Sequence, residues 1–201
     1  MAGQTREEIF GTAEQMFAEL GYHATSVRDI AKALDLRAGT LYNHFSSKED
    51  VLWEIVNRAA DQFLEAAEQV ADEEPSARLR SLIRQHVAVI AANLRNATVF
   101  FHEWRFLAPQ RRALIAERRN RYEAHFRRAI ADGVASGTFA PVDPKFAALI
   151  VLGALNWVYQ WFRPDGPASA GEVADRIHEF SARALAAAPK GAERATPVEV
   201  A

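Results

Sequence analysis

The sequence predicts an all-α protein of about nine helices, and three observations support this class. Apolar residues such as Ile9, Ala13 and Phe17 recur at spacings of three and four, the period of an amphipathic helix. Glycine and proline interrupt these periodic stretches where one helix would end and the next begin. No segment shows the alternation of apolar and polar residues that is typical of a strand.

Composition restricts the class of protein further. The chain has 201 residues, 49% of them hydrophobic, enough for one large or two small domains. It contains no cysteine, and its first residues lack the basic and apolar segments of a signal peptide. The longest apolar run, Phe146 to Tyr159, is shorter than the roughly 20 residues that a membrane span needs. We therefore expect a cytoplasmic protein with no membrane partner.

Local capping signals set the expected helix boundaries. Thr5 and Glu8 form the pattern of a capping box, and Gly21 is a C-cap signal. Pro109 and Pro144 suit the first turn of a helix. The expected helices span residues 5–21, 26–34, 37–45, 48–70, 76–94, 97–107, 109–135, 144–162 and 169–187, and residues 189–201 form a flexible tail.

The stretch TSVRDIAKALDLRAGTLYNHFSSK, residues 25–48, predicts two short helices joined by a tight turn. Thr25 is the expected N-cap of the first helix, because its hydroxyl can accept a hydrogen bond from a first-turn amide. Asp35 and Leu36 form the turn, where aspartate tolerates the left-handed conformation. A helix that lies in the major groove of DNA exposes small, polar or basic side chains. The second helix is expected to bury Leu41, Tyr42 and Phe45 and to expose Arg37, Ala38, Thr40, Asn43 and His44.

The motif TSVRDIA, followed by a short turn and then GTLYNHFSSKEDVL, resembles the TetR family of bacterial transcriptional regulators. The resemblance covers about residues 5–60. It implies a homodimer that binds a double-stranded DNA operator and releases it when a small molecule enters the second domain. Two positions depart from the family pattern: Asp35 stands where glycine is common, and Arg37 stands where a capping serine or threonine is common. The operator sequence therefore cannot be borrowed from relatives.

The outward residues and the resemblance together suggest the DNA contacts. The net charge of −2 makes nonspecific attraction to DNA modest, so specificity must depend on the second helix. Asn43 can pair bidentately with adenine, and Lys48 stands where the family places a phosphate-contacting lysine. The expected phosphate contacts are Thr25, Ser26, Arg28, Tyr42 and Lys48. The expected base-edge or groove contacts are Arg37, Ala38, Gly39, Thr40, Asn43 and His44.

The expected eighth helix is apolar on nearly every side. Such a helix must be buried on several faces. With the ninth helix it would form a four-helix bundle with the same pair from a second chain. The small residues that would permit close approach are Ala147, Ala148, Gly153 and Ala154. The resulting dyad would place two recognition helices about 34–36 Å apart on a palindromic operator. The other interpretation is that this helix is only the central core of its own domain.

Aromatic residues gather on the sixth helix and at the end of the eighth. Each one alone is typical of a core, but together they can line an apolar pocket in which a few polar groups orient a ligand. The expected effector site consists of Phe100, Phe101, His102, Glu103, Trp104, Arg118, Arg121, Asn156, Trp157, Gln160 and Trp161.

The expected seventh helix carries a run of arginines from Arg111 to Arg128. The run is either a solvated face or an anion site at the mouth of the pocket, since guanidinium groups suit phosphates and carboxylates. HEWRFL on the sixth helix and NWVYQWFRPDGP at the end of the eighth resemble a TetR branch that senses acyl-coenzyme A thioesters. That resemblance implies an apolar tunnel for the acyl chain. A hydrophobic drug or an aromatic acid would suit the pocket nearly as well.

Enzymatic, metal and cofactor sites lack support in the sequence. The histidines show no metal-ligand spacing, and no nucleophile elbow or phosphate loop is present. We interpret the chain as a homodimeric, ligand-responsive repressor without a cofactor. Residues 1–50 would bind DNA, residues 48–70 would connect, and residues 75–188 would dimerise and bind the effector. The alternatives are a repressor that senses a drug or aromatic metabolite, and a ligand-free architectural DNA-binding protein.

Overall fold

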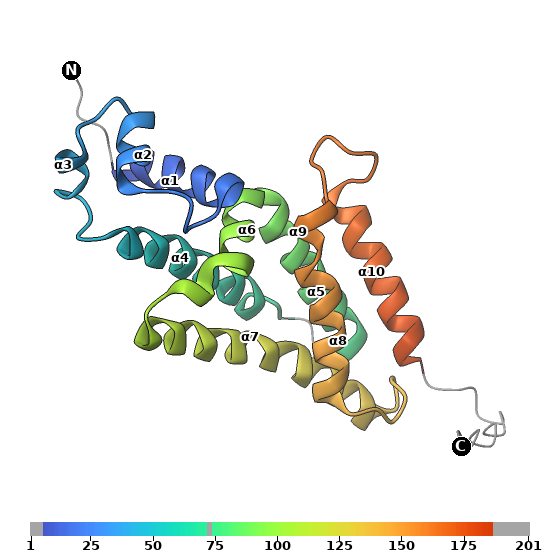
Figure 1. Cartoon of the computed structure of the whole chain (residues 1–201). Helices are drawn as coiled ribbons and strands as arrows, with labels where there is room; N and C mark the ends of the chain where they lie inside the picture. The colour runs from blue at the N-terminus through green and yellow to red at the C-terminus, as the bar shows by residue number, and fades with distance from the viewer. Residues whose placement is uncertain (1–5, 72–73, 187–201) are drawn as a thin grey trace, which may run out of the picture.

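The computed structural model describes residues 6–71 and 74–186, and it confirms the all-α class. The helices form a small N-terminal head and a larger C-terminal bundle, with one long helix extending through both (Figure 1). The elements are α1 (Arg6–Leu20), α2 (Val27–Ala33), α3 (Ala38–Leu41), α4 (Lys48–Glu68), α5 (Pro75–Ala92), α6 (Leu94–Glu103), the 3-10 helix η1 (Trp104–Phe106), α7 (Pro109–Ser136), α8 (Pro144–Asn156), α9 (Val158–Trp161) and α10 (Ala170–Leu185).

The head consists of α1, α2 and α3, in which α1 packs on α4 and on α2, and α2 packs on α3 (Figure 1). The apolar residues that recur along α1, among them Ile9 and Phe17, are buried against Ile30 of α2 and Leu41 of α3. Burying each large apolar side chain contributes roughly 1.5–3 kcal/mol. This small core therefore holds the two short helices in place, although neither would be stable alone.

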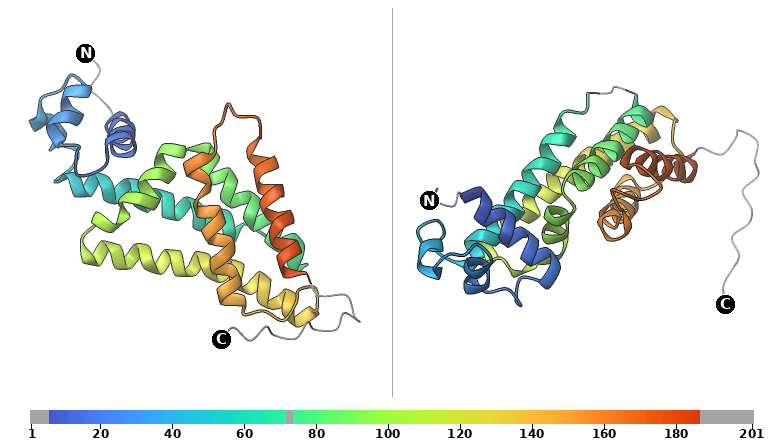
Figure 2. Two further views of the ribbon diagram at one scale, coloured as in Figure 1. Left: turned by 45° about the vertical axis from the view of Figure 1, so that its right-hand side comes forward. Right: turned by 90° about the horizontal axis from the view of Figure 1, so that it is seen from above.

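The bundle surrounds the second half of α4. Helix α7 packs against α4, α5 and α8, and α10 packs against α5 on the other side (Figure 2). The core side chains Leu82, Ile83, Ile115 and Phe126 are fully buried between these helices. Because buried residues recur along the whole of α4, from Val51 to Ala67, one apolar face of this helix belongs to both groups.

The expected extent of the third helix and the expected start of the sixth helix are wrong. Regular helix in α3 covers only Ala38–Leu41 instead of 37–45, and its N-cap Arg37 makes no side-chain capping bond within the described chain. The Phe45 amide still donates to the Leu41 carbonyl at 3.0 Å, so a tight turn continues the path. Helix α6 begins at residue 94, because the Asn93 side chain accepts a hydrogen bond from a first-turn amide.

The expected eighth helix is broken at Trp157, which ends α8 and precedes the short α9. Beyond the break, the Tyr159 ring stacks on Phe101, with 5.2 Å between ring centres, and the Gln160 side chain is hydrogen-bonded to His102. Apolar periodicity alone does not reveal such a break, because the pattern continues across it. Thr5, of the expected first capping box, and the expected tail at 189–201 lie outside the described residues.

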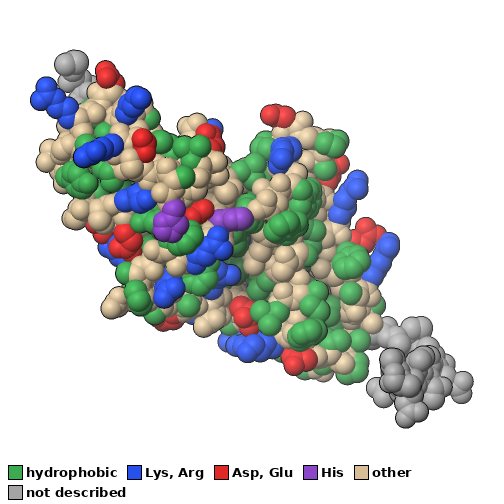
Figure 3. All heavy atoms as spheres, in the orientation of Figure 1, with side chains coloured by type: hydrophobic (Ala, Val, Ile, Leu, Met, Phe, Trp, Pro, Cys, Tyr) green, Lys and Arg blue, Asp and Glu red, His purple; other side chains and the backbone are tan. Residues whose placement is uncertain are grey.

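Helices α8 and α10 expose large apolar side chains on the protomer. Phe146 is 65% exposed, Ile150 58% and Phe180 75%. Apolar side chains gather over α8 and α10 in the view of Figure 3. A groove of about 390 Å³ lies between the two helices. The interpretation of the eighth helix as only the core of its own domain is therefore wrong, because part of this helix faces solvent.

Gly133 of α7 allows close packing against Phe139, which is buried. A Cβ at position 133 would overlap the Phe139 ring. Gly133→Ala should therefore lower the free energy of unfolding by about 1–3 kcal/mol, the usual cost of overpacking. Urea denaturation followed by circular dichroism measures this change.

Gly11→Ala is the matched control in α1, where no described atom lies within 4 Å of a Cβ. Alanine there should raise stability by roughly 0.5–1 kcal/mol through helix propensity. Equal effects of the two substitutions would show that Gly133 is not a packing constraint.

Candidate nucleic-acid interface and ligand cavity

The corners around α2 are formed as the sequence predicts. Asp35 has a φ of 54°, the left-handed conformation expected at the turn into α3. Gly21 has a φ of 88° and ends α1, with its amide donating to the Phe17 carbonyl at 3.1 Å. These two corners fix the directions in which α2 and α3 leave the core.

Ser26, and not Thr25, is the N-cap of α2. Its hydroxyl oxygen accepts a hydrogen bond from the Asp29 amide at 3.2 Å, and the Asp29 carboxylate accepts one from the Ser26 amide at 2.9 Å. The Thr25 side chain is 1% exposed, and its hydroxyl donates to the Gly21 carbonyl at 3.0 Å. The expected cap at Thr25 is wrong, because the Thr25 hydroxyl turns into the head instead of toward the first turn of α2. The same burial prevents this side chain from reaching a phosphate.

The Lys48 side chain is also held within the head. Its Nζ donates to the carbonyls of Tyr22 and Thr25 at 2.7 and 2.8 Å, and it lies 4.1 Å from the centre of the Tyr22 ring. Burial lowers the pKa of the Lys48 ammonium from its ordinary value. These contacts fasten the loop before α2 to the start of α4, and they leave one of three ammonium protons for a phosphate.

The other expected DNA contacts lie at or near the outer surface of the head. Tyr42 is 56% exposed, so its expected place on the buried side of the third helix is wrong. Regular helix ends at Leu41, and Tyr42 is the C-cap of α3. The exposed residues of the set are Ser26, Arg28, Arg37, Gly39, Tyr42 and Asn43, and the half-buried ones are Ala38, Thr40 and His44.

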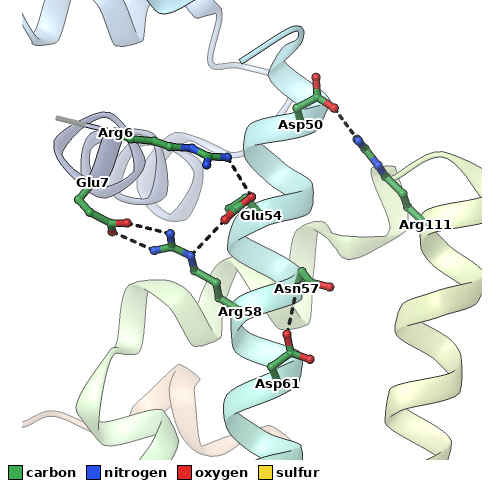
Figure 4. A network of polar contacts seen from close by, with 8 residues as sticks. All are labelled: Arg6, Glu7, Asp50, Glu54, Asn57, Arg58, Asp61 and Arg111. Carbon is green, nitrogen blue, oxygen red and sulfur yellow. Dashed lines mark hydrogen bonds and ion pairs between the residues drawn. The ribbon is translucent and has the colours of Figure 1, made fainter. Parts of the chain in front are cut away.

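Ion pairs attach α4 to α1 and to α7 (Figure 4). Arg58 of α4 donates to both carboxylate oxygens of Glu7 in α1, at 2.9 and 2.8 Å. Arg111 of α7 pairs with Glu49 and Asp50 in the first turn of α4, each at 2.6 Å. The hydrogen bond from Arg111 holds the pKa of Asp50 below its ordinary value. The start of α4 is therefore tied both to the head and to the bundle.

The end of α6 contacts the head directly. The Glu103 carboxylate accepts a hydrogen bond from the Tyr22 amide at 3.4 Å. The His23 ring meets the Phe106 ring of η1 edge-on, with 4.1 Å between centres. The expectation that Glu103 lines the ligand pocket is wrong, because its carboxylate faces the loop between α1 and α2.

A cavity of about 280 Å³ lies among α4, α5, α6, α7 and α8. Buried lining residues such as Phe63 and Phe100 mark its inner end, and the exposed residues Asn120 and Leu149 mark its mouth. Four of the expected effector residues line this cavity: Phe100, Phe101, Arg118 and Asn156.

The other expected effector residues do not line the cavity. The side chains of His102 and Gln160 are hydrogen-bonded to each other at 2.8 Å. Trp104 lies beneath the Arg119 guanidinium, 4.8 Å from it. Trp104 and Gln160 lie beyond the ends of α6 and α8, in η1 and α9, whereas His102 lies within the last turn of α6. The residues outside the lining are His102, Glu103, Trp104, Arg121, Trp157, Gln160 and Trp161.

Several arginines of α7 form ion pairs with carboxylates of the same chain. The run as a whole is therefore neither a purely solvated face nor a single anion site. Arg118 pairs with Asp61 of α4 at 2.9 Å, and Arg121 pairs with Glu68 at 3.0 Å. Arg119 differs because it is half-buried, lines the cavity, and forms no ion pair with a described carboxylate. Burial lowers the pKa of Arg119, yet a guanidinium keeps its charge in proteins. Among the described residues, Arg119 is thus a cation at the cavity without a carboxylate partner.

Sequence reasoning missed a polar pair in the cavity wall, His86 of α5 and Tyr122 of α7. The His86 Nδ1 atom and the Tyr122 hydroxyl lie 2.9 Å apart. Burial lowers the pKa of His86 to about 3 and raises that of Tyr122 above its ordinary value. A histidine on an otherwise apolar helix face was the available signal, but its partner on α7 is not evident without the fold.

Neither a metal site nor a membrane-spanning helix is found in the described part of the chain. Within residues 6–71 and 74–186, no three metal-ligating side chains group closely enough to hold an ion. No helix in these same ranges has the length and apolar character to cross a membrane.

Comparison with known proteins covers both parts of the chain. KstR2, an HTH-type transcriptional repressor of Mycobacterium tuberculosis, is 31% identical over 180 residues, which are 86% of this chain and 90% of KstR2. The TetR family regulator PfmR from Thermus thermophilus has a TM-score of 0.81 at 37% identity, covering 87% of this chain and 97% of PfmR. The structure of AibR with isovaleryl coenzyme A and operator DNA has a TM-score of 0.78 at 29% identity, covering 87% and 96%.

Two family matches correspond to the head and the bundle. Residues 9–55 match the bacterial regulatory proteins of the tetR family, and residues 72–185 match the tetracyclin repressor-like C-terminal domain. The head has the helix-turn-helix geometry that this family uses on DNA, and the bundle holds a cavity. The chain therefore belongs to the TetR family of bacterial transcriptional regulators and is not an enzyme.

Proposed function

We propose that this protein is a homodimeric repressor that binds a palindromic operator and releases it when a small ligand enters the cavity. One observation carries the proposal: α4 begins in the head at Lys48 and forms a cavity wall at Ala60 and Phe63. A ligand that displaces this wall also displaces the head. In this proposal residues 1–50 bind DNA, α4 connects, and residues 75–188 dimerise and hold the effector.

Release requires two states of the dimer that differ in the spacing of the heads. The effector shifts the equilibrium only if it binds the widely spaced state better than the DNA-bound state. Arg111 couples the start of α7 to the first turn of α4, and Glu103 couples the end of α6 to the head. Both α6 and α7 line the cavity, so these contacts provide a route from ligand to head.

The effector that the cavity suits best is an apolar group joined to an anion, as in an acyl-coenzyme A thioester. Aromatic walls accept the acyl group, and Arg119 lacks a carboxylate partner among the described residues. AibR, a relative, was crystallised with such a thioester. A volume of about 280 Å³ is small for a ligand pocket, so the coenzyme A portion would lie at the mouth. A drug or aromatic acid is the second candidate, favoured by the same aromatic walls.

The dimer is supported by the exposed apolar face of α8 and α10. Monomeric soluble proteins seldom expose large contiguous apolar patches. Phe146, Ile150 and Phe180 line the groove between the two helices, and a second copy of the same helices would cover them. A four-helix interface of this kind places the two heads on one side of a dyad, as a palindromic operator requires.

Operator release tests the proposed function. With an operator selected from random duplexes, isovaleryl coenzyme A should dissociate the complex in a mobility-shift assay, and isovaleric acid should not. Arg119→Gln should weaken this response about tenfold or more, because a charge-assisted hydrogen bond is lost. Arg112→Gln is the control, since Arg112 is exposed and bonds only weakly to the Arg105 carbonyl. Equal responses of both variants would exclude Arg119 as the anion site.

Base recognition is tested at Asn43. Asn43→Ala should reduce discrimination between the selected operator and a single-base variant by about 1–3 kcal/mol. Arg28→Ala should instead weaken binding to both duplexes equally and lower the salt dependence by about one phosphate contact. Fluorescence anisotropy over a range of salt concentrations separates the two effects. Unchanged discrimination by Asn43→Ala would remove this residue from base recognition.

The dimer interface is tested by introducing charge. Phe180→Glu together with Ile150→Glu should convert the dimer to a monomer in sedimentation-velocity experiments, because the new carboxylates would be desolvated at the interface. Leu114→Glu is the control, since Leu114 is also an apolar residue, 47% exposed, but lies on α7. A double variant that sediments as a dimer would place the interface elsewhere.

A further inference from the structure

The inner wall of the cavity contains the hydrogen-bonded pair of His86 and Tyr122, which the proposed function does not use. His86 is 1% exposed, and its ring packs against Phe63, with 4.9 Å between ring centres. The pair contributes polar atoms to a wall that is otherwise aromatic at this end. Polar groups in such surroundings are expensive to bury unless each one has a partner.

The pair holds one more proton than its internal hydrogen bond uses. The neutral imidazole carries one N–H and the phenol carries one O–H, but only one hydrogen bond joins Nδ1 to the hydroxyl. If the hydroxyl donates to Nδ1, the imidazole proton is on Nε2; if Nδ1 donates, the hydroxyl proton is free. The buried Nε2 has no hydrogen bond of good geometry to a described atom, and the one polar contact of this ring beyond Tyr122, with the Leu155 backbone, only partly opposes the lowering of the His86 pKa by burial. Either tautomer therefore leaves the pair with one donor that has no well-formed hydrogen bond to a described atom, in two side chains that line the cavity.

The charge state of the pair determines which chemical group it suits. Burial lowers the pKa of His86 to about 3 and raises that of Tyr122, so both groups are neutral near pH 7. A neutral donor in an aromatic wall suits an uncharged oxygen, whereas an anion there would lose its hydration without gaining a counter-ion. Of the two arginines that line the cavity, Arg118 pairs with Asp61 and Arg119 stacks on Trp104.

We propose that His86 and Tyr122 recognise a ketone or hydroxyl oxygen on the apolar portion of the effector. This inference rests on the proposed ligand-responsive role of the same cavity. It restricts the class of effector: the acyl group must carry an oxygen at its end distant from the coenzyme A portion, which is the end that reaches the inner wall of the cavity. A plain hydrocarbon group would leave the free donor of the pair unpaired, so it binds more weakly.

Two matched pairs of probes test the inference on the full-length protein. The first pair is 4-oxocyclohexylacetyl coenzyme A and cyclohexylacetyl coenzyme A, and the second is 2-indanone and indane. Isothermal titration calorimetry should show that the oxygenated member of a pair binds about five- to tenfold more tightly, the usual contribution of one neutral hydrogen bond. Nitrogen-15 NMR of the His86 imidazole should shift with the ketones only.

The double variant His86→Phe and Tyr122→Phe removes both donors and should abolish the preference. Tyr159→Phe is the matched control, because the Tyr159 hydroxyl bonds to Gln160 and does not line the cavity. It should keep the full preference. If the double variant does not fold, the inference is still tested on the wild-type protein by its preference for the oxygenated probes and by the nitrogen-15 shift of the His86 imidazole.

The outcomes separate this inference from the proposed function. Equal binding within both pairs would overturn the inference and leave a thioester-sensing repressor intact. A preference for 2-indanone without binding of either thioester would support the inference and remove coenzyme A from the proposed function. Failure of all four probes to bind the wild-type protein would overturn the inference, because the cavity would then not be a ligand site.

Discussion

Helix α4 is packed by two groups of helices: by α1 of the head, and by α5, α6 and α7 of the bundle, with α7 reaching as far as the first turn of α4. Large buried side chains such as Leu52, Ile55 and Phe63 form one apolar face along it. Each contributes roughly 1.5–3 kcal/mol, whereas a surface ion pair contributes about 0–1 kcal/mol. Packing therefore supplies the stability of this arrangement. The ion pairs of Arg58 and Arg111 contribute mainly by selecting one rotation of α4 relative to its neighbours.

Much of the fold was predictable because it depends on signals that are local in the sequence. The apolar period located the main helices, and Gly21 and Asp35 marked two corners that the structure confirms with positive φ angles. The family was also predictable, because the helix-turn-helix motif is specific. The exact first and last residues of the helices were less predictable. Ser26 and Thr25 are both good N-caps in isolation, and only packing of the Thr25 side chain into the head decides between them.

The cavity was predicted less well because its residues are brought together by tertiary packing. Phe100, Phe101, Arg118 and Asn156 were found from composition, but a helix wheel cannot show that η1 turns Trp104 onto Arg119. Glu103 was assigned to the cavity from its neighbours in sequence, although a long-range hydrogen bond takes it to Tyr22. His86 and Tyr122 lie 36 positions apart, and no local pattern associates them.

The exposed apolar face of α8 and α10 has a consequence for how the stability of this protein depends on its abundance. If a second copy covers Phe146 and Phe180, the folded state is favoured by mass action as well as by internal packing. The melting temperature then rises with protein concentration. At a low number of copies per cell, the melting temperature of such a regulator would be near its lowest value. The copy number then sets both the occupancy of the operator and the fraction of unfolded chains exposed to proteolysis.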